Sequence, residues 1–273
     1  MNGNSEAQGF ALVTGASAGI GAAFARELAA RGHALVLTAR RIDRLEALAG
    51  ELASRHGVRV ECIAADLADP AAPAALCAEI ARRGLAIDVL VNNAGYGVPG
   101  SFLVPPWQAH ADFIQVMITA PCELVYKLLS GMRERGRGRI VNVASLAGLI
   151  PGSAGHTLYA ASKAFLIKFS QSLALENAVH GVKVCALCPG FTYSEFHDVT
   201  GTRGVVSKMP GWMWLDAASV ARIGMDAVER GEIVCVTGRV NRIIKALFKL
   251  LPDRMALRMI QKRSKNFRNA DGA

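Results

Sequence analysis

The feature that most constrains the fold of this chain is a repeated alternation of short apolar runs with stretches of helical periodicity. The apolar runs are continuous and rich in Val, Ile and Leu, so we expect strands that are buried on both faces. Such strands, separated by helices, predict a parallel sheet covered on each side: a doubly wound α/β fold of three layers, α/β/α. The predicted strands are residues 10–13, 34–38, 58–65, 87–91, 139–144, 182–187 and 233–237.

A glycine-rich turn joins the first predicted strand to the first helical pattern, residues 22–30. The turn reads Thr14-Gly15-Ala16-Ser17-Ala18-Gly19-Ile20-Gly21. Strand, glycine turn and helix form the context of a dinucleotide site, because the phosphates then lie at the helix N-terminus. We expect Gly15 to allow a tight turn, Gly19 to let a pyrophosphate approach the backbone, and Gly21 to let helix and strand pack closely. A glycine turn that binds no ligand is the alternative.

Tyr159 and Lys163 stand four residues apart in the sequence Tyr-Ala-Ala-Ser-Lys. On a helix this spacing places a phenol and an ammonium one turn apart on the same face. The pKa of a free tyrosine is near 10, and a cation beside the phenol favours the phenolate, so we expect Tyr159 to exchange a proton closer to neutral pH. Tyr and Lys at this spacing also occur by chance in many helices, so the meaning of the pair depends on its neighbours.

Three further short motifs follow predicted strands. They are Asn92-Asn93-Ala94-Gly95 after the fourth strand, Ser145 after the fifth, and Pro189-Gly190 after the sixth. With the glycine turn and the Tyr159/Lys163 pair, in this order, the chain resembles the short-chain dehydrogenase/reductase family from about residue 10 to about residue 238. The resemblance implies a Rossmann-like fold, a nicotinamide cofactor, and hydride transfer between that cofactor and an alcohol or carbonyl.

The resemblance also implies roles for individual residues. Tyr159 would be the catalytic acid/base, Lys163 would activate it and anchor the nicotinamide ribose, and Ser145 would orient the substrate oxygen. These roles agree with the chemistry, because a carbonyl that accepts hydride develops negative charge on oxygen, which two hydroxyls stabilise while one delivers a proton. The expected cofactor-binding residues are Gly15, Ser17, Gly19, Ile20, Gly21, Arg40, Asp66, Leu67, Asn93, Ala94, Gly95, Tyr159, Lys163, Pro189, Gly190 and Ser194, and no metal site is expected.

The end of the second predicted strand indicates which nicotinamide cofactor is bound. In dinucleotide folds an acid at this point accepts the adenine ribose hydroxyls, whereas an arginine favours a 2′-phosphate. Here the strand ends in Arg40 and Arg41, and the next carboxylate is Asp43. NADP(H) is therefore favoured over NAD(H), with Arg40 as the phosphate ligand. The alternative, above all for Arg41, is that the arginines only begin a solvated helix.

One position departs from the family pattern. The family carries an asparagine on the helix after the Asn-Asn-Ala-Gly motif, where it helps to maintain a water-filled proton route from the lysine to solvent, and this chain has Met117. A thioether neither donates nor strongly accepts hydrogen bonds. Either Thr119, a backbone carbonyl or water takes over the relay, or the enzyme is slowed or repurposed. Ser194 is a smaller departure, since it retains the hydroxyl of the usual threonine that bonds the carboxamide.

Length and composition predict a single large domain. The chain has 273 residues, 52% of them hydrophobic, and contains no linker-like segment or internal repeat. We expect a dinucleotide-binding and catalytic domain over residues 1–238 and a basic amphipathic extension over 239–273. The first six residues have neither a basic start nor a long apolar stretch, and no run reaches the ~18 apolar residues of a membrane span, so we expect a cytoplasmic protein.

The cysteines show no disulfide framework. Cys185 and Cys188 form a Cys-x-x-Cys motif that is compatible with a redox pair, but on a strand the two side chains point to opposite faces. We therefore interpret them as buried apolar residues. The six cysteines are Cys62, Cys77, Cys122, Cys185, Cys188 and Cys235.

Two segments bracket the substrate in this family, residues 146–158 and the stretch after Gly190. The second contains Phe191, Tyr193, Phe196, Met209, Trp212, Met213 and Trp214. Ligand sites are usually lined by such side chains, which predicts a bulky apolar substrate. The alternative is that they pack a helix onto the sheet. His156 in the first segment is either an assisting group or an ordinary loop histidine.

The basic charge of the chain is concentrated at its C-terminal end. Residues 239–273 contain ten Lys or Arg and two Asp, and the whole chain has a net charge of +9. Residues 239–251 alternate apolar and basic side chains at helical spacing and end before Pro252, which predicts an amphipathic helix. Its function is membrane-surface contact through 239–268, a lid or subunit contact that meets an acidic partner, or packing on the enzyme with a solvated basic face. Nucleic-acid binding is disfavoured, because no base-reading motif accompanies the charge.

These observations predict an NADP(H)-dependent oxidoreductase that acts on a carbonyl or alcohol of a bulky apolar small molecule. The alternative is a regulatory or scaffolding protein that binds the cofactor while its catalysis is weakened at Met117. The family resemblance further implies a homodimer or homotetramer, and the basic C-terminal helix leaves open a peripheral association with a membrane.

Overall fold

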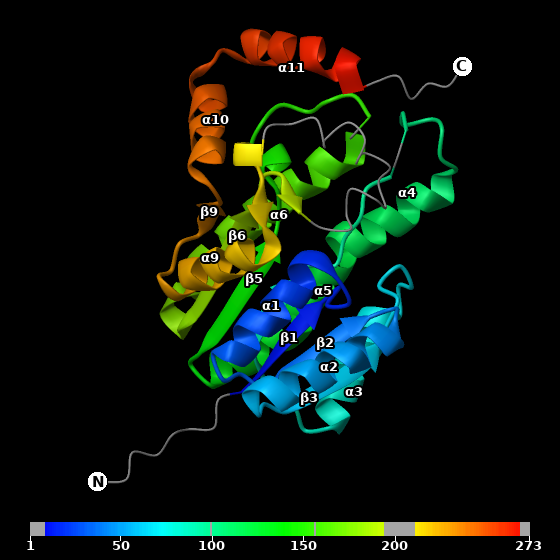
Figure 1. Cartoon of the computed structure of the whole chain (residues 1–273), viewed down its shortest axis with the longest axis vertical. Helices are drawn as coiled ribbons and strands as arrows, with labels where there is room; N and C mark the ends of the chain where they lie inside the picture. Colours follow the sequence, from blue (N-terminus) through cyan, green and yellow to red (C-terminus); the bar gives the residue numbers. More distant parts are fainter. Residues whose placement is uncertain (1–8, 99, 156, 194–210, 268–273) are drawn as a thin grey trace.

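Seven parallel strands form one sheet in the order β3-β2-β1-β4-β5-β6-β9 (Figure 1). This computed structural model describes residues 9–98, 100–155, 157–193 and 211–267, with side chains up to residue 261. The predicted doubly wound parallel sheet is confirmed, and every predicted strand is present with its ends shifted by at most two residues. The strands are β1 (Phe10–Thr14), β2 (Leu35–Ala39), β3 (Val60–Ala64), β4 (Ile87–Asn92), β5 (Gly138–Val143), β6 (Val182–Cys188) and β9 (Val234–Val236).

Helices cover both faces of the sheet. One face is covered by α1 (Gly19–Ala30), α2 (Ile42–His56) and α9 (Ala217–Glu229), and the other by α3 (Ala72–Arg82), α5 (Ala120–Glu134) and α6 (Thr157–Asn177). The shorter elements are α4 (Trp107–Ile114), the π-helical turn η1 (Gln115–Thr119), the 3-10 turns η2 (Leu146–Gly148), η3 (Ala178–His180) and η4 (Gly211–Met213), and the two-residue strands β7 (Thr192–Tyr193) and β8 (Leu215–Asp216). The predicted three layers are therefore present.

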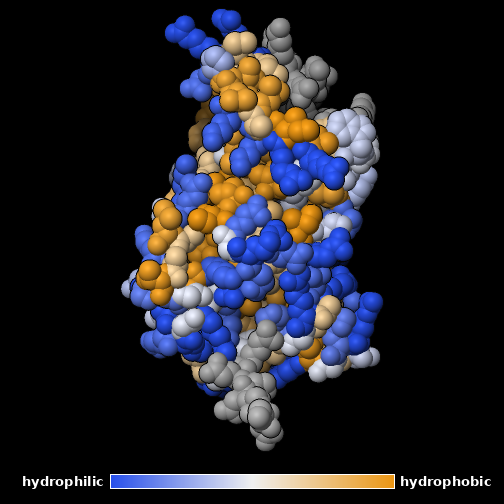
Figure 2. All heavy atoms as spheres, turned by 90° about the vertical axis from the view of Figure 1, so that its left-hand side faces the viewer, coloured by the Kyte–Doolittle hydropathy of each residue, from blue (hydrophilic) through white to orange (hydrophobic). Residues whose placement is uncertain are grey.

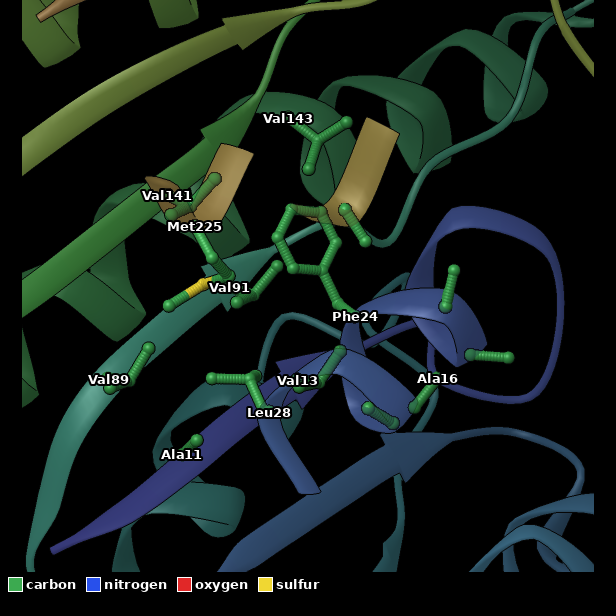
Figure 3. Close-up of a cluster of buried hydrophobic side chains, with 14 of the residues drawn as sticks. Ala11, Val13, Ala16, Phe24, Leu28, Val89, Val91, Val141, Val143 and Met225 are labelled. Atoms are coloured by element: carbon green, nitrogen blue, oxygen red, sulfur yellow. The ribbon is translucent and has the colours of Figure 1, made fainter. Parts of the chain in front are cut away.

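Alternate side chains of each strand enter the two halves of the core. Phe24 of α1 is fully buried and points among Val13, Val91, Val143 and Met225, which come from β1, β4, β5 and α9 (Figure 3). The neighbours of these strand residues, such as Leu12 and Leu90, face the other layer, because successive residues of a strand point to opposite sides. The sheet is thus apolar on both faces, as the continuous apolar runs predict.

The order of the strands determines where a ligand can bind. The chain passes from β1 outward to β2 and β3, then returns so that β4 pairs with the other side of β1. Connections leave the carboxyl ends of β1 and β4 in opposite directions, which opens a crevice at that edge of the sheet. The glycine turn follows β1, and the Asn-Asn-Ala-Gly motif follows β4, so the topology brings both to this crevice.

One continuous helical stretch, Trp107–Glu134, is long and apolar enough to cross a membrane by length and composition, which was not expected from the sequence. Its second half is α5, whose Leu124, Val125 and Met132 lie buried in the core beside the sheet. Core helices pass the same test of length and composition, and we interpret this stretch as one.

The chain continues after β9 into α10 (Arg239–Leu250) and α11 (Asp253–Phe267). The predicted amphipathic helix is confirmed as α10, and Pro252 stands between the two helices as expected. α10 runs along one side of the molecule, and α11 turns across its end (Figure 1).

Candidate active site

The glycine turn between β1 and α1 has the backbone conformation that the sequence predicts. Gly15 and Gly19 have positive φ angles of 65° and 55°, a region that favours glycine. The N-cap residue of α1, Ala18, provides no side-chain cap, and the first turn of the helix holds no acidic residue. The N–H groups and the positive dipole end of α1 are therefore available to a ligand, and a phosphate is the group that suits them.

Gly21 is required by close contact within the turn. A Cβ at this position would overlap the carbonyl oxygen of Gly15 and the side-chain amide of Asn93. Backbone atoms cannot move away from such a contact without distorting the turn. The geometry thus requires glycine at this position for the close approach of the start of α1 to Gly15 and Asn93.

The side chain of Asn93 holds the turn in place. Its Nδ2 donates hydrogen bonds to the carbonyl oxygens of Thr14 at 2.9 Å and Gly15 at 3.3 Å. The hydroxyl of Thr14, which is fully buried, accepts hydrogen bonds from the backbone N–H groups of Asn93 and Ala94, each at 3.0 Å. From the sequence, Asn93 is expected to contact the cofactor, and no role is expected for Thr14. Both position the glycine turn.

Two arginines stand beside the turn at the carboxyl end of β2. Arg40 and Arg41 both have exposed side chains. Arg41 is the N-cap residue of α2, and its guanidinium donates to Oγ of Ser17 in the glycine turn at 3.1 Å. The sequence favours Arg40 as the phosphate ligand and leaves open that Arg41 only begins a solvated helix. The contact with Ser17 makes Arg41 a second candidate for a phosphate group at this position.

Asp66 and Leu67 follow β3 at the same edge of the sheet. Asp66 is exposed, and its Oδ1 accepts a hydrogen bond from the N–H of Ala68 at 3.1 Å. Leu67 is only 6% exposed and packs in a cluster with Val116 and the partly buried Ala94. Asp66 is thus accessible to a ligand, while Leu67 supports the wall that Ala94 forms.

Taken together, these residues suit a dinucleotide. The helix end without a cap, the glycine backbone and the exposed arginines offer donors for phosphate groups in a row from β1 to β2. Ile20 is half-buried and packs against the core below the turn.

Ser145 and Tyr159 come together from different elements. Ser145 follows β5, and its Oγ accepts a hydrogen bond from the N–H of Ala147 at 3.1 Å at the start of η2. Tyr159 lies in the first turn of α6, and a side-chain hydrogen bond joins it to Ser145. Both side chains are half-buried. The structure therefore unites the two hydroxyls that the sequence analysis grouped.

Lys163 is also present, but it acts on Tyr159 differently from our expectation. Its Nζ lies 5.7 Å from the centre of the Tyr159 ring and donates a hydrogen bond to the carbonyl oxygen of Val143 at 2.7 Å. The pKa of Tyr159 is raised above its ordinary value, because burial disfavours the phenolate, and the hydrogen bond with Ser145 opposes this only in part. The expected shift toward neutral pH is therefore wrong for the protein alone. Burial is the larger cause of the shift, and the hydrogen bond with Ser145 is the smaller, opposing one.

Burial also changes the lysine itself. Lys163 is 6% exposed, and desolvation lowers the pKa of its ammonium from 10.5 to about 8, with Cys188 opposing the shift weakly. A charge held by a neutral carbonyl in a buried place is costly. The phenol and the ammonium thus have pKa values that burial has moved in opposite directions.

Gly148 allows the Ser145 turn to reach α6, a contact that the sequence does not predict. A Cβ at Gly148 would lie 2.6 Å from the backbone nitrogen of Ala164 and the carbonyl carbon of Lys163. Any larger residue would push η2 away from α6. The distance between Ser145 and Tyr159 therefore depends on Gly148.

A buried polar chain aligns the strands with α6, and it too was missed. Nδ2 of Asn92 donates to Oδ1 of Asn142 at 2.9 Å, and Nδ2 of Asn142 donates to Oγ of Ser170 at 2.8 Å. Ser170 in turn donates to the carbonyl oxygen of Leu166 at 2.7 Å. Asn142 and Ser170 are fully buried, so each bond is expensive to break. The only sequence signal is a polar residue inside an apolar strand.

Met117 lies directly beneath the Asn-Asn-Ala-Gly motif. It belongs to η1, is 1% exposed, and its sulfur would be 2.8 Å from a Cβ on Gly95. Thr119, one of the groups considered as a replacement in the proton relay, has an exposed side chain. A backbone carbonyl, that of Val143, does contact Lys163. A carbonyl oxygen only accepts hydrogen bonds, so this contact anchors Lys163 and does not by itself replace the proton relay.

The substrate side of the site is partly described. Leu146 donates its N–H to the carbonyl oxygen of Pro189 at 2.9 Å, so the Pro-Gly loop adjoins the Ser145 turn. The rings of Phe191 and Tyr193 lie 5.5 Å and 4.6 Å from the ring of Trp214. These aromatic residues cluster as expected beside the site. Ser194, Phe196, Met209 and His156 lie outside the described residues.

The cysteines form no disulfide in the described chain. Cys185, Cys188 and Cys235 are buried, and burial raises the pKa of all three thiols, to about 12 for Cys188 and about 11 for Cys235. Thiols with raised pKa values are poor nucleophiles at neutral pH. Their role is packing, as the sequence analysis favoured.

Comparison with known proteins agrees with this geometry. Residues 9–202 match the model of the short chain dehydrogenase family. Nodulation protein G of Rhizobium meliloti (strain 1021) is 42% identical over 191 residues, which cover 69% of this chain and 75% of that protein. The very-long-chain 3-oxoacyl-CoA reductase of Anas platyrhynchos is 32% identical over 269 residues, which cover 95% of this chain and 81% of that protein.

A solved structure supports the same assignment. A short-chain dehydrogenase from Sphingobium yanoikuyae, in complex with NADPH, has a TM-score of 0.78 and 31% identity, with 90% of this chain and 97% of that chain covered. The family match spans the glycine turn, the Asn-Asn-Ala-Gly motif and the Ser145, Tyr159 and Lys163 group. The chain belongs to the short-chain dehydrogenase family.

Proposed function

We propose that this protein is an NADP(H)-dependent oxidoreductase that interconverts a carbonyl and an alcohol on a bulky apolar substrate. The observation that carries the proposal is the hydrogen-bonded pair of Ser145 and Tyr159, with the Lys163 ammonium 5.7 Å from the phenol ring. The pair lies at the edge of the sheet where the glycine turn suits a dinucleotide. NADPH bound to the Sphingobium relative supports the choice of cofactor.

The proposed chemistry divides between cofactor and protein. The glycine turn, the exposed arginines and Lys163 would hold the dinucleotide, which would supply or accept the hydride when bound. In the reducing direction the carbonyl oxygen gains negative charge, and Ser145 and Tyr159 are the donors that stabilise it. The phenol O–H bond of Tyr159 breaks as a new O–H bond forms on the substrate. In the oxidising direction the phenolate takes this proton back.

The protonation state of Tyr159 suits the reducing direction. Burial raises the pKa of this phenol, so it is protonated at neutral pH and holds the proton that the substrate oxygen would receive. The pKa of Lys163 is about 8, so its ammonium can release a proton near neutral pH. It is therefore a suitable source for the proton that returns Tyr159 to the phenol form. The carbonyl oxygen of Val143 accepts a hydrogen bond from the ammonium of Lys163 and so holds the ammonium beside the phenol ring.

The surroundings of the site support a bulky apolar substrate. Phe191, Tyr193 and Trp214 form a contiguous aromatic cluster next to the Pro189-Gly190 loop. The duck relative is named for the reduction of a 3-oxo group on a very long acyl chain, a carbonyl with a large apolar substituent. Both observations favour a ketone or aldehyde with an extended apolar part.

Three further expectations belong to this proposal. The catalytic unit occupies residues 1–238, the enzyme works in the cytoplasm, and it assembles as a homodimer or homotetramer. Each rests on the family resemblance and on the sequence. Size-exclusion chromatography with light scattering checks the last.

Tyr159→Phe tests the proposed function. We expect a fall in kcat of at least about 100-fold on any apolar ketone or aldehyde that the parent reduces with NADPH, because only the transferable proton is removed. The affinity for NADPH should stay within about twofold. Steady-state kinetics and fluorescence titration measure the two quantities, with Tyr126→Phe at an 82% exposed position as the matched control. A mutant as fast as the parent would refute the acid/base role.

Arg40→Ala and Arg41→Ala test the cofactor preference. Loss of a charge-assisted hydrogen bond of about 1.5–3 kcal/mol should raise the Kd for NADPH about tenfold to a hundredfold, with little effect on NADH. Arg40 is the primary candidate, and the Ser17 contact predicts a smaller but distinct effect for Arg41. The exposed Arg55 at the far end of α2 gives the control Arg55→Ala. Equal weakening of both cofactors would contradict the assignment.

Lys163→Met tests the buried charge through the pH dependence of stability. The native pKa of about 8 lies below the unfolded value of 10.5, so the unfolded state binds more protons between these pH values and stability rises with pH there. Below pH 8 the buried charge costs a constant amount of about 3 kcal/mol. We expect the difference in unfolding free energy between mutant and parent to change by about 2 kcal/mol from about pH 7 to about pH 9.5.

Urea unfolding in the absence of cofactor measures this difference. Loss of the bond to Val143 also destabilises the mutant, but that loss does not depend on pH, so only the change with pH is diagnostic. Lys168→Met removes an exposed lysine from the same helix and serves as the control. A parallel pH profile for Lys163→Met and the parent would show that Lys163 is not desolvated.

Met117→Asn tests whether the proton relay limits the rate. Met117 fills the space beneath Gly95 with a group that cannot hold water, so we expect asparagine to raise kcat about two- to tenfold and to reduce the solvent isotope effect. Met117→Leu keeps an apolar side chain of similar volume and should leave both quantities unchanged. An unchanged kcat with the isotope effect preserved would show that the relay already runs through other groups.

A further inference from the structure

Helix α10 carries an apolar stripe that the described part of the chain leaves uncovered. Ile243, Leu247 and Leu250 are 67%, 46% and 84% exposed. Spacings of four and three residues place them on one face of the helix. Figure 2 views the side of the molecule along which α10 runs and shows hydrophobic side chains gathered toward its upper end, beside hydrophilic ones.

A different face of α10 holds the helix on the domain. Asn241 is 3% exposed, and its Nδ2 donates to the carbonyl oxygen of Thr237 at 2.8 Å. A Cβ on Gly190 would overlap this side chain, so Asn241 packs directly on the Pro-Gly loop of the candidate site. Ile244 and Phe248 are half-buried on the same side. Since α10 has its own packed face, the exposed stripe is not needed to attach it.

Basic side chains border the exposed stripe. Arg242, Lys245 and Lys249 follow one another at spacings of three and four residues, which forms a second stripe along the helix. Arg242 and Lys249 are exposed. Within residues 239–261 the only carboxylate is Asp253, so the segment cannot neutralise its own charge. The exposed side of α10 is therefore half apolar and half cationic.

The same combination continues into α11. Met255, Leu257 and Met259 are 52%, 53% and 39% exposed, and Arg254 and Arg258 are exposed between and beside them. α11 turns across the end of the molecule from the end of α10 (Figure 1). The apolar and basic character thus extends beyond a single helix.

An exposed tryptophan lies close to the start of α10. Trp212, 68% exposed, belongs to η4, and Leu215 a few residues later would lie 3.4 Å from a Cβ on Gly238, which precedes α10. Tyr193, 57% exposed, stacks on Trp214 in the same segment. Tryptophan and tyrosine are suited to the boundary between apolar and aqueous phases, because one part of each ring system is apolar and another carries a donor.

We propose that α10 and the first part of α11 bind the surface of an anionic lipid membrane, with Ile243, Leu247 and Leu250 inserted at the boundary of headgroups and acyl chains. Lipid phosphates are the counter-charge for the basic stripe, and the acyl region takes the apolar stripe. A second copy of the chain is a poorer occupant, since a symmetric contact would bring two basic stripes together. The proposal is independent of the proposed activity.

The position of α10 connects this surface with the site. Asn241, on the packed face of α10, contacts the Gly190 loop, so α10 lies between a bilayer on its exposed stripe and the loop that adjoins the aromatic cluster.

Vesicle flotation with the full-length protein tests the proposal. We expect the parent to bind phosphatidylcholine vesicles that contain about 30% phosphatidylglycerol at least tenfold more tightly than vesicles of phosphatidylcholine alone, with roughly this size expected from several basic residues near the surface. The triple variant Ile243→Ser, Leu247→Ser, Leu250→Ser should lose binding to both. The triple variant Arg242→Gln, Lys245→Gln, Lys249→Gln should lose the preference for anionic lipid.

Matched controls distinguish binding through this surface from nonspecific adsorption through other exposed apolar side chains. Leu175→Ser with Val179→Ser replaces side chains that are 75% and 87% exposed near the end of α6 and should bind as the parent does. Thermal unfolding verifies that every variant is folded, and all the substituted apolar side chains of α10 are solvent-exposed. Ile243→Glu alone provides a second variant with a single change, and it should also lose binding.

Each outcome decides the proposal. The proposal is overturned if the parent does not bind anionic vesicles. It is also overturned if the variant with serine at positions 243, 247 and 250 binds as well as the parent, since binding would then depend on charge alone. Sedimentation velocity adds one alternative result: a parent dimer that the stripe variants convert to monomers, without lipid binding, would assign the surface to a second copy. Lipid binding that requires both stripes and is unaffected at Leu175 and Val179 supports the proposal.

Discussion

The hydrogen-bonded junction between the ends of β1 and β4 is the interaction on which the site depends. The connections that follow β1 and β4 run in opposite directions at this point. The hydrogen bonds of the parallel sheet do not by themselves hold these two loops together. Thr14 and Asn93 hold these loops together. The hydroxyl of Thr14 accepts a hydrogen bond from the backbone N–H of Asn93, and the side-chain amide of Asn93 donates one to the carbonyl oxygen of Thr14. Thr14 is fully buried, so losing either partner would leave a desolvated group at a cost of about 1–3 kcal/mol. The crevice that suits the dinucleotide is therefore held by bonds that do not involve the ligand.

The sequence predicted the sheet well because strand identity is a local property. Continuous apolar runs and glycine-rich turns can be recognised in a sequence without knowledge of the residues that surround them in space. Gly15, Gly19 and Gly21 lie in the turn between β1 and α1, as the sequence predicts. The missed residues depend on contacts between distant segments. Gly148 matters because α6 approaches it, and Asn142 matters because Ser170 lies opposite, and neither partner is local. The pKa of Tyr159 differs from the sequence-based expectation for the same reason, since burial is a property of the fold and is the largest cause of the raised pKa.

The site shows how function and stability oppose each other here. Lys163 could stabilise the fold more as an apolar residue, because its ammonium is almost inaccessible and faces a neutral carbonyl. That cost is tolerated in a core with fully buried neighbours on both faces of the sheet. The benefit lies in a proton-exchanging group close to neutral pH beneath a phenol that burial keeps protonated. The two opposite shifts arise from one cause, desolvation, acting on an acid and on a base.

The C-terminal helix shows what periodicity alone cannot distinguish. An amphipathic pattern predicts one apolar face, and the sequence left open whether that face packs on the enzyme or meets a membrane. In the structure α10 has apolar side chains on two faces, because Ile244 and Phe248 pack while Ile243, Leu247 and Leu250 remain in solvent. Folding explains only the first set. The second set adjoins cations for which residues 239–261 offer Asp253 alone as a counter-charge, and an apolar stripe beside such cations is complementary to a phosphate-bearing lipid surface rather than to water.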